Sequence, residues 1–316
     1  MPALELNART AWENIFKKSA RWTSPPRLLP VAEPRFETSF QIEQGAKIFT
    51  VGSCFARNIE MHLEKEGFDI PSRRYFAGAE LINKYNPYSI LQEFRWALGL
   101  DQRPGPDARL IPVTDNGWFD LQLHNAVEEA GSREDCIYWI EQSARFFDEM
   151  KTCRYFILTL GLIEVWYDRE TNTYINEPLN FVKYYEDNES LQRQFADRFV
   201  FRILNFSEAY AAMHEVFTLI KQVCPDPRAI LTVSPVPLVG SFGGDDVMVA
   251  NTYSKSLLRA VAEEIRREFN FIDYFPSYES ITLSPPEAVW EDDRVHVKDS
   301  AVAVNVRRMV EAYLQR

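Results

Sequence analysis

The sequence predicts an α/β fold with a doubly wound parallel sheet and helices on both of its faces. Short, almost continuously apolar runs recur along the chain, and such runs are typical of buried parallel strands. Segments with apolar residues at a helical period of about 3.6 separate the runs, and parallel strands need helical crossovers of this kind. In such sheets ligands bind beyond the carboxyl ends of the strands.

Each strand is predicted where an apolar run ends at a turn. The first run, residues 47–51, ends at a Gly-Ser-Cys turn, and the second, residues 154–160, ends at Gly161. A third run at residues 229–233 is followed by a Ser-Pro turn, and a further strand is predicted at residues 269–274.

Helices are predicted between these strands. The first follows the first strand directly, from residue 55 to residue 66, and Gly67 ends it. Ser207 is a candidate N-cap of the second, the third spans residues 251–269, and the last begins at Ala301.

The chain is predicted to form one elaborated domain behind an N-terminal arm. Residues 1–45 are rich in proline and aromatic residues and show little periodicity, so we expect an irregular arm with one short helix near residues 11–18. Residues 46–316 form the domain, with large insertions around residues 68–150 and 168–200. The second insertion is predicted to begin with a hairpin.

Composition excludes several classes of protein. The 316 residues are 46% apolar and 26% charged, as in a globular protein and unlike a disordered chain. Lysine and arginine number 35 against 46 acidic residues, and the net charge of −11 argues against a nucleic-acid partner. The first 22 residues contain no apolar stretch long enough for a signal peptide, and no run of about 18 apolar residues occurs, so we expect a cytoplasmic protein that does not span a membrane.

The 4 cysteines are scattered, without the spacing of a metal site or a disulfide framework. We therefore expect reduced thiols, no metal and no cofactor. The sequence does not indicate an oligomeric state.

Ser53 is the candidate nucleophile. It lies between the first strand and the first helix, where backbone N–H groups at the helix start can stabilise a developing oxyanion. Serine at such a junction also caps helices without any catalytic role, so both interpretations stay open. Cys54 is a third possibility, either as a nucleophile if its thiol is ionised or as a small buried residue behind the turn.

An Asp-His pair near the C-terminus is the candidate proton relay. Asp293 precedes His296 by three residues, a spacing that lets the carboxylate reach Nδ1 of the imidazole and leaves Nε2 free to accept a proton. Asp292 and Asp299 are alternative carboxylates. The order along the chain places Ser53 and this pair at the same edge of the predicted sheet.

Gly52 to Ala56 spell the motif for which the GSCFA family is named. Over about residues 45–300 the chain resembles this family, which is assigned to the SGNH (GDSL-like) hydrolase superfamily. Segments 86–90, 159–166 and 234–237 are also similar to family segments. The resemblance implies a three-layer, flavodoxin-like SGNH-hydrolase fold with large insertions.

The resemblance also implies roles for the candidate residues. Ser53 would be the nucleophile, and Asp293 and His296 would complete a catalytic triad. Related hydrolases have a Gly-x-Asn segment that donates to the oxyanion, but Ile163 replaces the asparagine here and its side chain has no donor. Losing one such donor costs about 10²–10³ in rate.

Other residues are candidates for the missing donor and for the pocket. Asn86 would otherwise be a turn residue, and His124 is a further candidate. Glu164 follows a strand and either lines the site or pairs with an arginine. The predicted oxyanion and substrate pocket consists of Gly52, Cys54, Asn86, His124, Gly161, Glu164 and Trp166.

These residues predict a serine esterase of SGNH type that acts on ester bonds, with acylated carbohydrate suggested by analogy. Two alternatives stay open. The same residues would serve an O-acyltransferase that passes the acyl group to a glycan, and a decayed oxyanion hole would leave a non-catalytic glycan-binding or scaffolding protein. The expected partner is a small-molecule or glycan ester.

Overall fold

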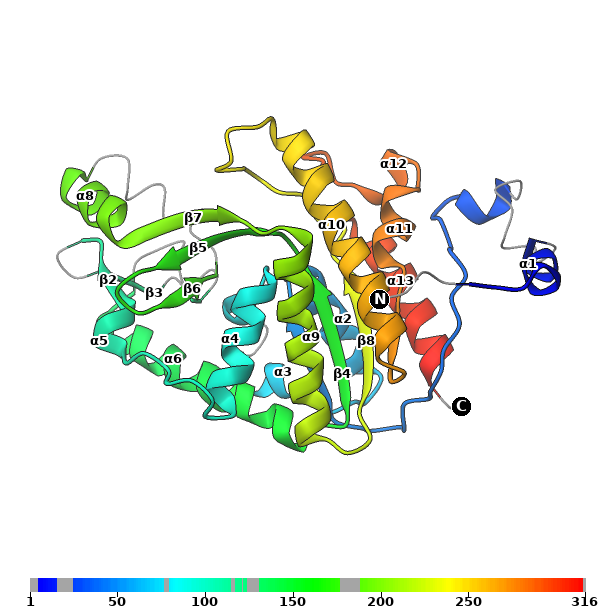
Figure 1. Cartoon of the computed structure of the whole chain (residues 1–316), viewed down its shortest axis with the longest axis horizontal. Coiled ribbons are helices and arrows are strands. Elements are labelled where there is room, and N and C mark those ends of the chain that lie inside the picture. Colours follow the sequence, from blue (N-terminus) through cyan, green and yellow to red (C-terminus); the bar gives the residue numbers. More distant parts are fainter. Residues whose placement is uncertain are drawn as a thin grey trace.

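A parallel sheet lies at the centre of the computed structural model, which describes residues 5–15, 25–76, 80–114, 117–120, 122–123, 131–176 and 188–314. Its strand order is β1-β4-β8-β9, and Figure 1 shows the two middle strands, β4 and β8, side by side. All the predicted strands are confirmed, although the last begins later than expected. They are β1 (Ile48–Gly52), β4 (Tyr155–Leu160), β8 (Arg228–Val233) and β9 (Ile272–Tyr274).

Helices cover both faces of the sheet, which gives the three predicted layers. Side chains alternate between the faces along each strand, so Ile157 belongs to one hydrophobic cluster and Leu158 to the other. One face packs against α2 (Cys54–Lys65) and α13 (Asp299–Tyr313). The other packs against α4 (Pro87–Ala97), α6 (Arg133–Asp148), α9 (Phe206–Val223) and α10 (Val247–Glu268).

Two helix starts differ from the prediction. Asn205 caps α9 and forms a capping box with Glu208, whereas Ser207 lies inside the first turn. The box satisfies two backbone N–H groups at once, which a lone serine cap does not. The α10 helix begins at Val247, ahead of the expected start at residue 251.

Shorter helices complete the layers. They are α1 (Ala8–Ile15), α3 (Pro71–Phe76), α5 (Pro106–Arg109), α8 (Glu189–Arg198), α11 (Ser277–Thr282) and α12 (Pro286–Val289), with 3₁₀ turns at Pro25–Leu28, Glu80–Ile82 and Glu149–Thr152. Within the described ranges, no helix is both long and apolar enough to cross a membrane.

Strands from the two insertions fold together into a lobe beside the sheet, here called the insertion lobe. It contains β2 (Leu110–Pro112), β3 (Trp118–Asp120), β5 (Glu164–Asp168), β6 (Thr173–Ile175), β7 (Phe199–Ile203) and α8. The predicted hairpin is present as β5–β6, although it begins at Glu164, ahead of the expected start at residue 168, and β7 pairs with the other edge of β5. A hydrophobic cluster joins Ile111 and Phe119 of the first insertion to Ile175 and Phe195 of the second.

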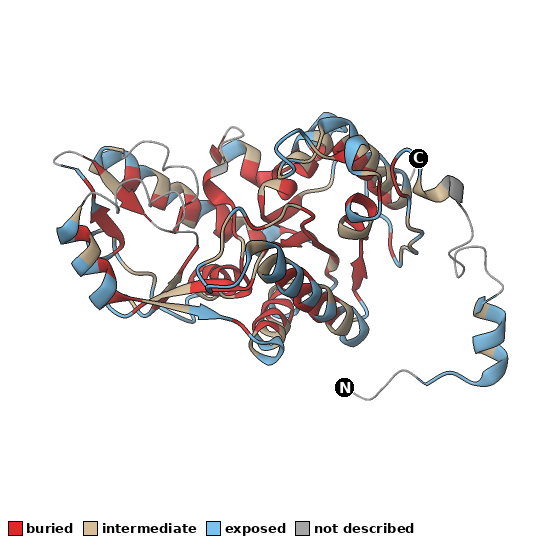
Figure 2. Cartoon of the chain, turned by 90° about the horizontal axis from the view of Figure 1, so that it is seen from above, coloured by how far each residue is buried: buried red, intermediate tan, exposed pale blue. Residues whose placement is uncertain are grey.

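The N-terminal arm is attached to the body of the protein around Ala32. This residue is buried, its N–H donates to Ser284 Oγ at 2.7 Å, and its carbonyl oxygen accepts from Ser280 Oγ at 2.6 Å. By contrast α1, which begins earlier than predicted, has no buried residue, and Figure 2 shows it exposed. The division between arm and domain near residue 45 stays a prediction.

Two glycines let three chain segments meet at the carboxyl end of the sheet. Gly52 has a φ of +151°, and a Cβ on it would lie 2.5 Å from the carbonyl oxygen of Thr159. A Cβ on Gly161 would lie 2.9 Å from the carbonyl oxygen of Tyr85. Backbone hydrogen bonds use this closeness: Lys84 N–H donates to the Gly52 carbonyl at 2.8 Å, and Gly161 N–H donates to the Tyr85 carbonyl at 2.9 Å.

Gly52→Ala is expected to destabilise the fold, because its methyl group would clash with the backbone of β4 and the positive φ disfavours any side chain. We expect a loss of about 2–4 kcal/mol in the free energy of unfolding, measured in urea. Gly99→Ala is the matched control, since Gly99 also has a positive φ, of +67°, but its Cβ would meet nothing within 4 Å. Equal losses in the two variants would contradict the clash.

Candidate active site

The turn after β1 places Ser53 at the start of α2. Its backbone has N-cap geometry, with φ −73° and ψ −179°, but its side chain makes no capping hydrogen bond. The residue is 1% exposed, and Oγ has no hydrogen-bond partner in the part of the chain that the structure describes. The capping interpretation is therefore wrong for this hydroxyl, which is available for another role.

Two more buried polar groups lie at the ends of β1 and β4. Asn86 caps α4 with Oδ1, which accepts the Ser89 N–H at 2.8 Å, while its Nδ2 has no partner among the described residues. Thr159 lies opposite Gly52 in the parallel ladder, and its buried Oγ1 is likewise unpaired there. Buried polar groups are nearly always paired, so such a group of unpaired ones marks a place that a ligand or a moving side chain completes.

Lys255 of α10 is a residue of this site that the sequence analysis missed. It is 2% exposed, and its Nζ donates to the carbonyl oxygen of Gly161 at 2.7 Å. The neighbouring Ser254 Oγ accepts the Ile163 N–H at 3.2 Å, so α10 holds the segment after β4 at two points. A lysine at helical spacing from buried residues such as Leu258 is the sequence signal that could have identified it.

Burial changes the acid-base properties of Lys255. It lowers the pKa of the ammonium group to about 7, because the protein interior solvates the charge poorly. A charge interaction with Cys54 opposes this shift. Cys54 follows Ser53 and is half-buried, not fully buried behind the turn as expected. A lysine that titrates near neutral pH therefore lies beside the first turn of α2.

The loop between α12 and α13 builds the predicted Asp-His pair. Trp290 and Val297 form an antiparallel bridge that closes the loop. Inside it, Asp293 Oδ1 accepts the N–H groups of Val295 and His296 at 2.9 Å, and Oδ2 lies 2.5 Å from His296 Nδ1. The hydrogen bond from the imidazole, followed by those from the backbone, lowers the pKa of Asp293 to about 2. Asp293, and neither of its two alternatives, is the carboxylate that contacts the histidine.

The structure does not bring this pair into contact with Ser53. The side chain of His296 is 72% exposed, whereas Ser53 is buried and its Oγ bonds to no described group. Both parts nevertheless lie toward the same end of the sheet. In Figure 1, α12 and the start of α13 lie at the end where the parallel strands finish.

Other predicted pocket residues have partners elsewhere. Glu164 accepts a hydrogen bond from Ser241 Oγ and, at 3.0 Å, from the Phe242 N–H, so its carboxylate holds the loop before α10 and pairs with none of the described arginines. Trp166 packs against three phenylalanine rings, one of them Phe242. His124 lies outside the described residues.

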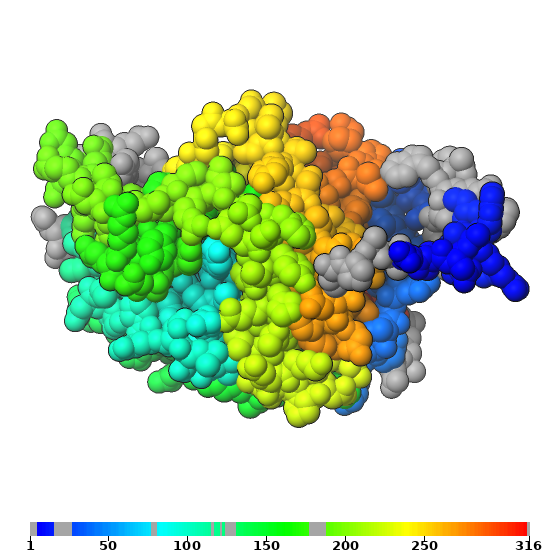
Figure 3. Space-filling model, in the orientation of Figure 1, coloured from blue at the N-terminus to red at the C-terminus, as the bar shows by residue number. Residues whose placement is uncertain are grey.

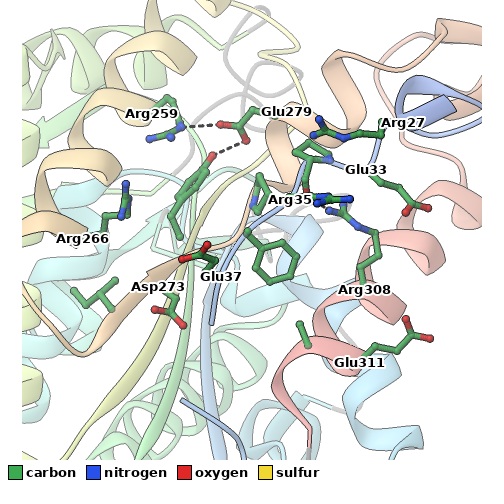
Figure 4. Close-up of a pocket in the computed structure, with 16 residues that line it drawn as sticks. Arg27, Glu33, Arg35, Glu37, Arg259, Arg266, Asp273, Glu279, Arg308 and Glu311 are labelled. Atoms are coloured by element: carbon green, nitrogen blue, oxygen red, sulfur yellow. Dashed lines mark hydrogen bonds and ion pairs between the residues drawn. The ribbon is translucent and has the colours of Figure 1, made fainter. Parts of the chain in front are cut away.

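A wide groove of about 1290 Å³ lies at the β9 edge of the sheet (Figure 4). The N-terminal arm, β9, α10 and α13 line it. Arginine and acidic side chains face one another across it, and Arg259 Nε donates to Glu279 at 2.7 Å. No predicted catalytic or pocket residue lies among its lining residues, so this groove is separate from the candidate site.

The fold and the site together define an α/β protein with a serine turn at the carboxyl end of a parallel sheet. The model of the GSCFA family matches residues 47–309, and the chain belongs to this family. The matched range includes the Ser53 turn, Asn86, Lys255 and the Asp-His loop. No curated protein matches the chain.

Two solved structures have a limited likeness to this chain. One is a family two carbohydrate esterase from Clostridium thermocellum in complex with cellohexaose, with 11% identity, a TM-score of 0.30, and coverage of 85% of this chain and 64% of that chain. The other is a mutant of an acetyl-xylooligosaccharide esterase from Geobacillus Stearmophilus, with 13% identity and a TM-score of 0.34. The match covers 88% of this chain and 100% of that chain. This chain thus spans less than two thirds of the first structure, and likeness at this level decides nothing about substrate.

Lys255→Met is expected to change how stability depends on pH. The pKa of Lys255 falls from 10.5 to about 7 on folding, so between these values the unfolded chain binds more protons and the wild type gains stability as pH rises. This slope is at most about 1.4 kcal/mol per pH unit and is absent from the variant.

Urea unfolding of both proteins from about pH 6 to about pH 9 measures the difference. Lys221→Met, at an exposed lysine of α9, is the control and should keep the slope of the wild type. Parallel stability curves for the wild type and Lys255→Met would contradict the lowered pKa.

Proposed function

We propose that the chain is a serine-dependent hydrolase of ester bonds. The observation that supports this best is the Ser53 hydroxyl, which lies at a helix start, makes no capping bond and shares the sheet edge with the Asn86 amide, whose Nδ2 has no partner among the residues described. Ser53 Oγ attacks the ester carbonyl carbon, and His296 Nε2 takes the hydroxyl proton. Asp293 keeps the imidazole oriented. His296 then returns the proton to the leaving alcohol, and water releases the acid from the acyl-enzyme.

Two kinds of hydrogen-bond donor would stabilise the negative charge of the tetrahedral intermediate. Backbone N–H groups at the start of α2 lie at the positive end of the helix dipole and supply the first. We assign the second to Asn86 Nδ2, which is buried and has no partner within the described ranges. This assignment replaces the donor that Ile163 cannot supply.

The proposal requires the Asp-His loop to move toward the turn. Proton transfer needs His296 Nε2 about 2.6–3.2 Å from Ser53 Oγ, and the structure lacks this contact. Because the hydrogen bonds of Asp293 are made within the loop, the loop can move without losing its Asp-His contact. We expect the contact between His296 and Ser53 to form when a substrate occupies the turn.

A non-catalytic glycan-binding protein is the second candidate. The exposed position of His296, apart from the buried Ser53, favours it, as does the missing donor at Ile163. The two candidates differ in one chemical property, which is whether Ser53 reacts with an acyl or phosphoryl donor.

Ser53 is expected to react with diethyl p-nitrophenyl phosphate. An Oγ–P bond forms, p-nitrophenolate leaves, and His296 takes the serine proton. Mass spectrometry of the digested protein should find the diethylphosphoryl group on Ser53 in the wild type, and Ser53→Ala should hydrolyse p-nitrophenyl acetate at the background rate.

Ser143→Ala is the matched control, because Ser143 of α6 is also buried, with a hydroxyl that bonds to no residue in the described ranges, but lies outside the site. If Ser53 stays unlabelled, and wild type and Ser53→Ala hydrolyse p-nitrophenyl acetate at equal rates, the hydrolase is contradicted and the non-catalytic glycan-binding protein is favoured. Transfer of the acyl group to an added glycan, in place of release as acid, would identify an O-acyltransferase with the same nucleophile.

Asn86→Ser is expected to lower kcat by about 10²–10³, because serine still caps α4 but offers no amide N–H to the oxyanion. The Michaelis constant should change little, since the lost bond strengthens only in the transition state. Asn205→Ser makes the same change at the cap of α9 and should leave kcat unchanged. A kcat for Asn86→Ser within about threefold of wild type would remove Asn86 from the oxyanion hole.

A further inference from the structure

A groove of about 490 Å³ lies between α4 and the β5–β6 hairpin, and we call it the α4–hairpin groove. Its volume is within the range of about 300–1,000 Å³ that is usual for ligand sites. Figure 3 shows cyan residues of the α4 region against green residues of the hairpin region on the face toward the viewer. The lining residues are Tyr88, Leu91, Gln92, Arg95, Trp96, Asp101, Gln102, Thr171, Asn172, Thr173 and Tyr174.

The charges of the α4–hairpin groove cancel. Arg95 and Asp101 are its charged lining residues, and Arg95 Nε donates to Asp101 Oδ2 at 2.6 Å. Arg95 also pairs with Glu215 of α9 outside the groove. The other lining side chains are aromatic rings, amides, hydroxyls and one leucine. This chemistry selects a neutral ligand, because an ion would find no unpaired countercharge among the lining residues.

Two tyrosines form the aromatic part of the groove. Tyr88 of α4 and Tyr174 of β6 stack with ring centroids 4.3 Å apart and an interplanar angle of 21°, and both remain partly exposed. Burial raises the pKa of both phenols, so they stay uncharged at neutral pH. Gln92 fixes their relative position, because Oε1 accepts the Tyr174 N–H at 2.9 Å and Nε2 donates to the Tyr174 carbonyl. Rings held in place before binding cost a ligand little ordering entropy.

Polar groups without partners lie around these rings. The Tyr88 hydroxyl and the Gln102 amide make no hydrogen bond among the described residues. Asn172, at the hairpin turn with φ +55°, uses Oδ1 to accept the Tyr167 hydroxyl at 2.9 Å, and its side-chain N–H groups donate to no residue that the structure describes. Apolar ring surface next to hydroxyl and amide groups matches a sugar, which presents C–H groups on its faces and hydroxyls on its edges.

The α4–hairpin groove is built on the same frame as the candidate active site. Tyr88 is the second residue after Asn86, in the first turn of α4. Asn176, directly after β6, accepts the Tyr85 N–H and the Ser89 hydroxyl, each at 3.1 Å. The hairpin that carries Tyr174 is therefore tied to the segment that carries the candidate oxyanion donor.

We propose that the α4–hairpin groove binds a neutral oligosaccharide. On the proposed function, on which this second step rests, the bound chain is the carbohydrate part of an acylated substrate whose ester reaches Ser53. The groove then accounts for substrate selection by contacts that are remote from the reacting atoms.

Isothermal titration of the full chain with xylohexaose, cellohexaose and maltohexaose tests the groove. These probes have no ester, so their binding does not depend on catalysis by Ser53. We expect at least one to bind, Tyr88→Ala to weaken it about tenfold and Tyr88→Phe to keep most of the affinity. Tyr253→Ala, at an exposed tyrosine of α10 outside the groove, is the control and should bind as the wild type does.

Gln102→Ala, at an exposed loop residue, serves as the second variant if Tyr88→Ala does not fold, and a drop in affinity is expected there too. Absence of binding by all three probes at millimolar concentration would overturn the proposal, as would binding that both groove variants leave unchanged. Tighter binding of a galacturonic acid hexamer than of the three neutral hexaoses would contradict the inference that the ligand is neutral. Oligosaccharide binding without labelling of Ser53 would contradict the proposed hydrolase and support the proposed oligosaccharide site. Labelling of Ser53 without oligosaccharide binding would support the hydrolase and contradict the oligosaccharide site.

Discussion

The candidate site depends on the close packing of the Tyr85 backbone against the ends of β1 and β4. The Tyr85 carbonyl accepts an N–H from the segment after β4, its own N–H is held by Asn176, and the residue before it donates to Gly52. Glycine at 52 and 161 leaves the space for this contact. Because the segment continues directly into α4, one backbone contact fixes both Asn86 at the sheet edge and the first turn of α4 at the groove.

Buried polar groups beside the serine turn have fewer hydrogen-bond partners than buried polar groups that only support the fold. Lys84 and Lys255 are both fully buried, but Lys84 Nζ bonds to Glu93 and to the Gln122 carbonyl, each at 2.8 Å, whereas the one bond of Lys255 in the described structure is to the Gly161 carbonyl. An unsatisfied buried polar group costs about 1–3 kcal/mol. The ion pair of Lys84 and Glu93 is completed by the Gln122 carbonyl beside the insertion lobe, whereas incompletely paired groups gather beside the serine turn, as is usual where a site binds or reacts.

Local sequence patterns predicted the parts of the protein that local interactions build. The apolar runs predicted the parallel strands, and the three-residue spacing predicted the contact of Asp293 with His296, because the loop forms that contact by itself. Lys255 escaped prediction because it lies on α10, whereas its partner Gly161 lies just after β4, far away in the sequence. The capping interpretation of Ser53 failed for a related reason: a serine at a strand-helix junction has the same local sequence whether or not its hydroxyl bonds to the helix.

The two halves of the proposed triad differ in what holds them. Ser53 is set by the sheet, by α2 and by the Tyr85 segment, so its position is as rigid as the core. His296 is set by hydrogen bonds within one exposed loop, and nothing in the described structure ties its Nε2 to the sheet. The Ser53 hydroxyl in its buried turn and the His296 Nε2 on its exposed loop are complementary, since within the described ranges each lacks the partner that the other supplies. A ligand that excludes water from the turn strengthens the hydrogen bond between Ser53 Oγ and His296 Nε2, because the local dielectric constant falls. Substrate binding and completion of the triad therefore favour each other.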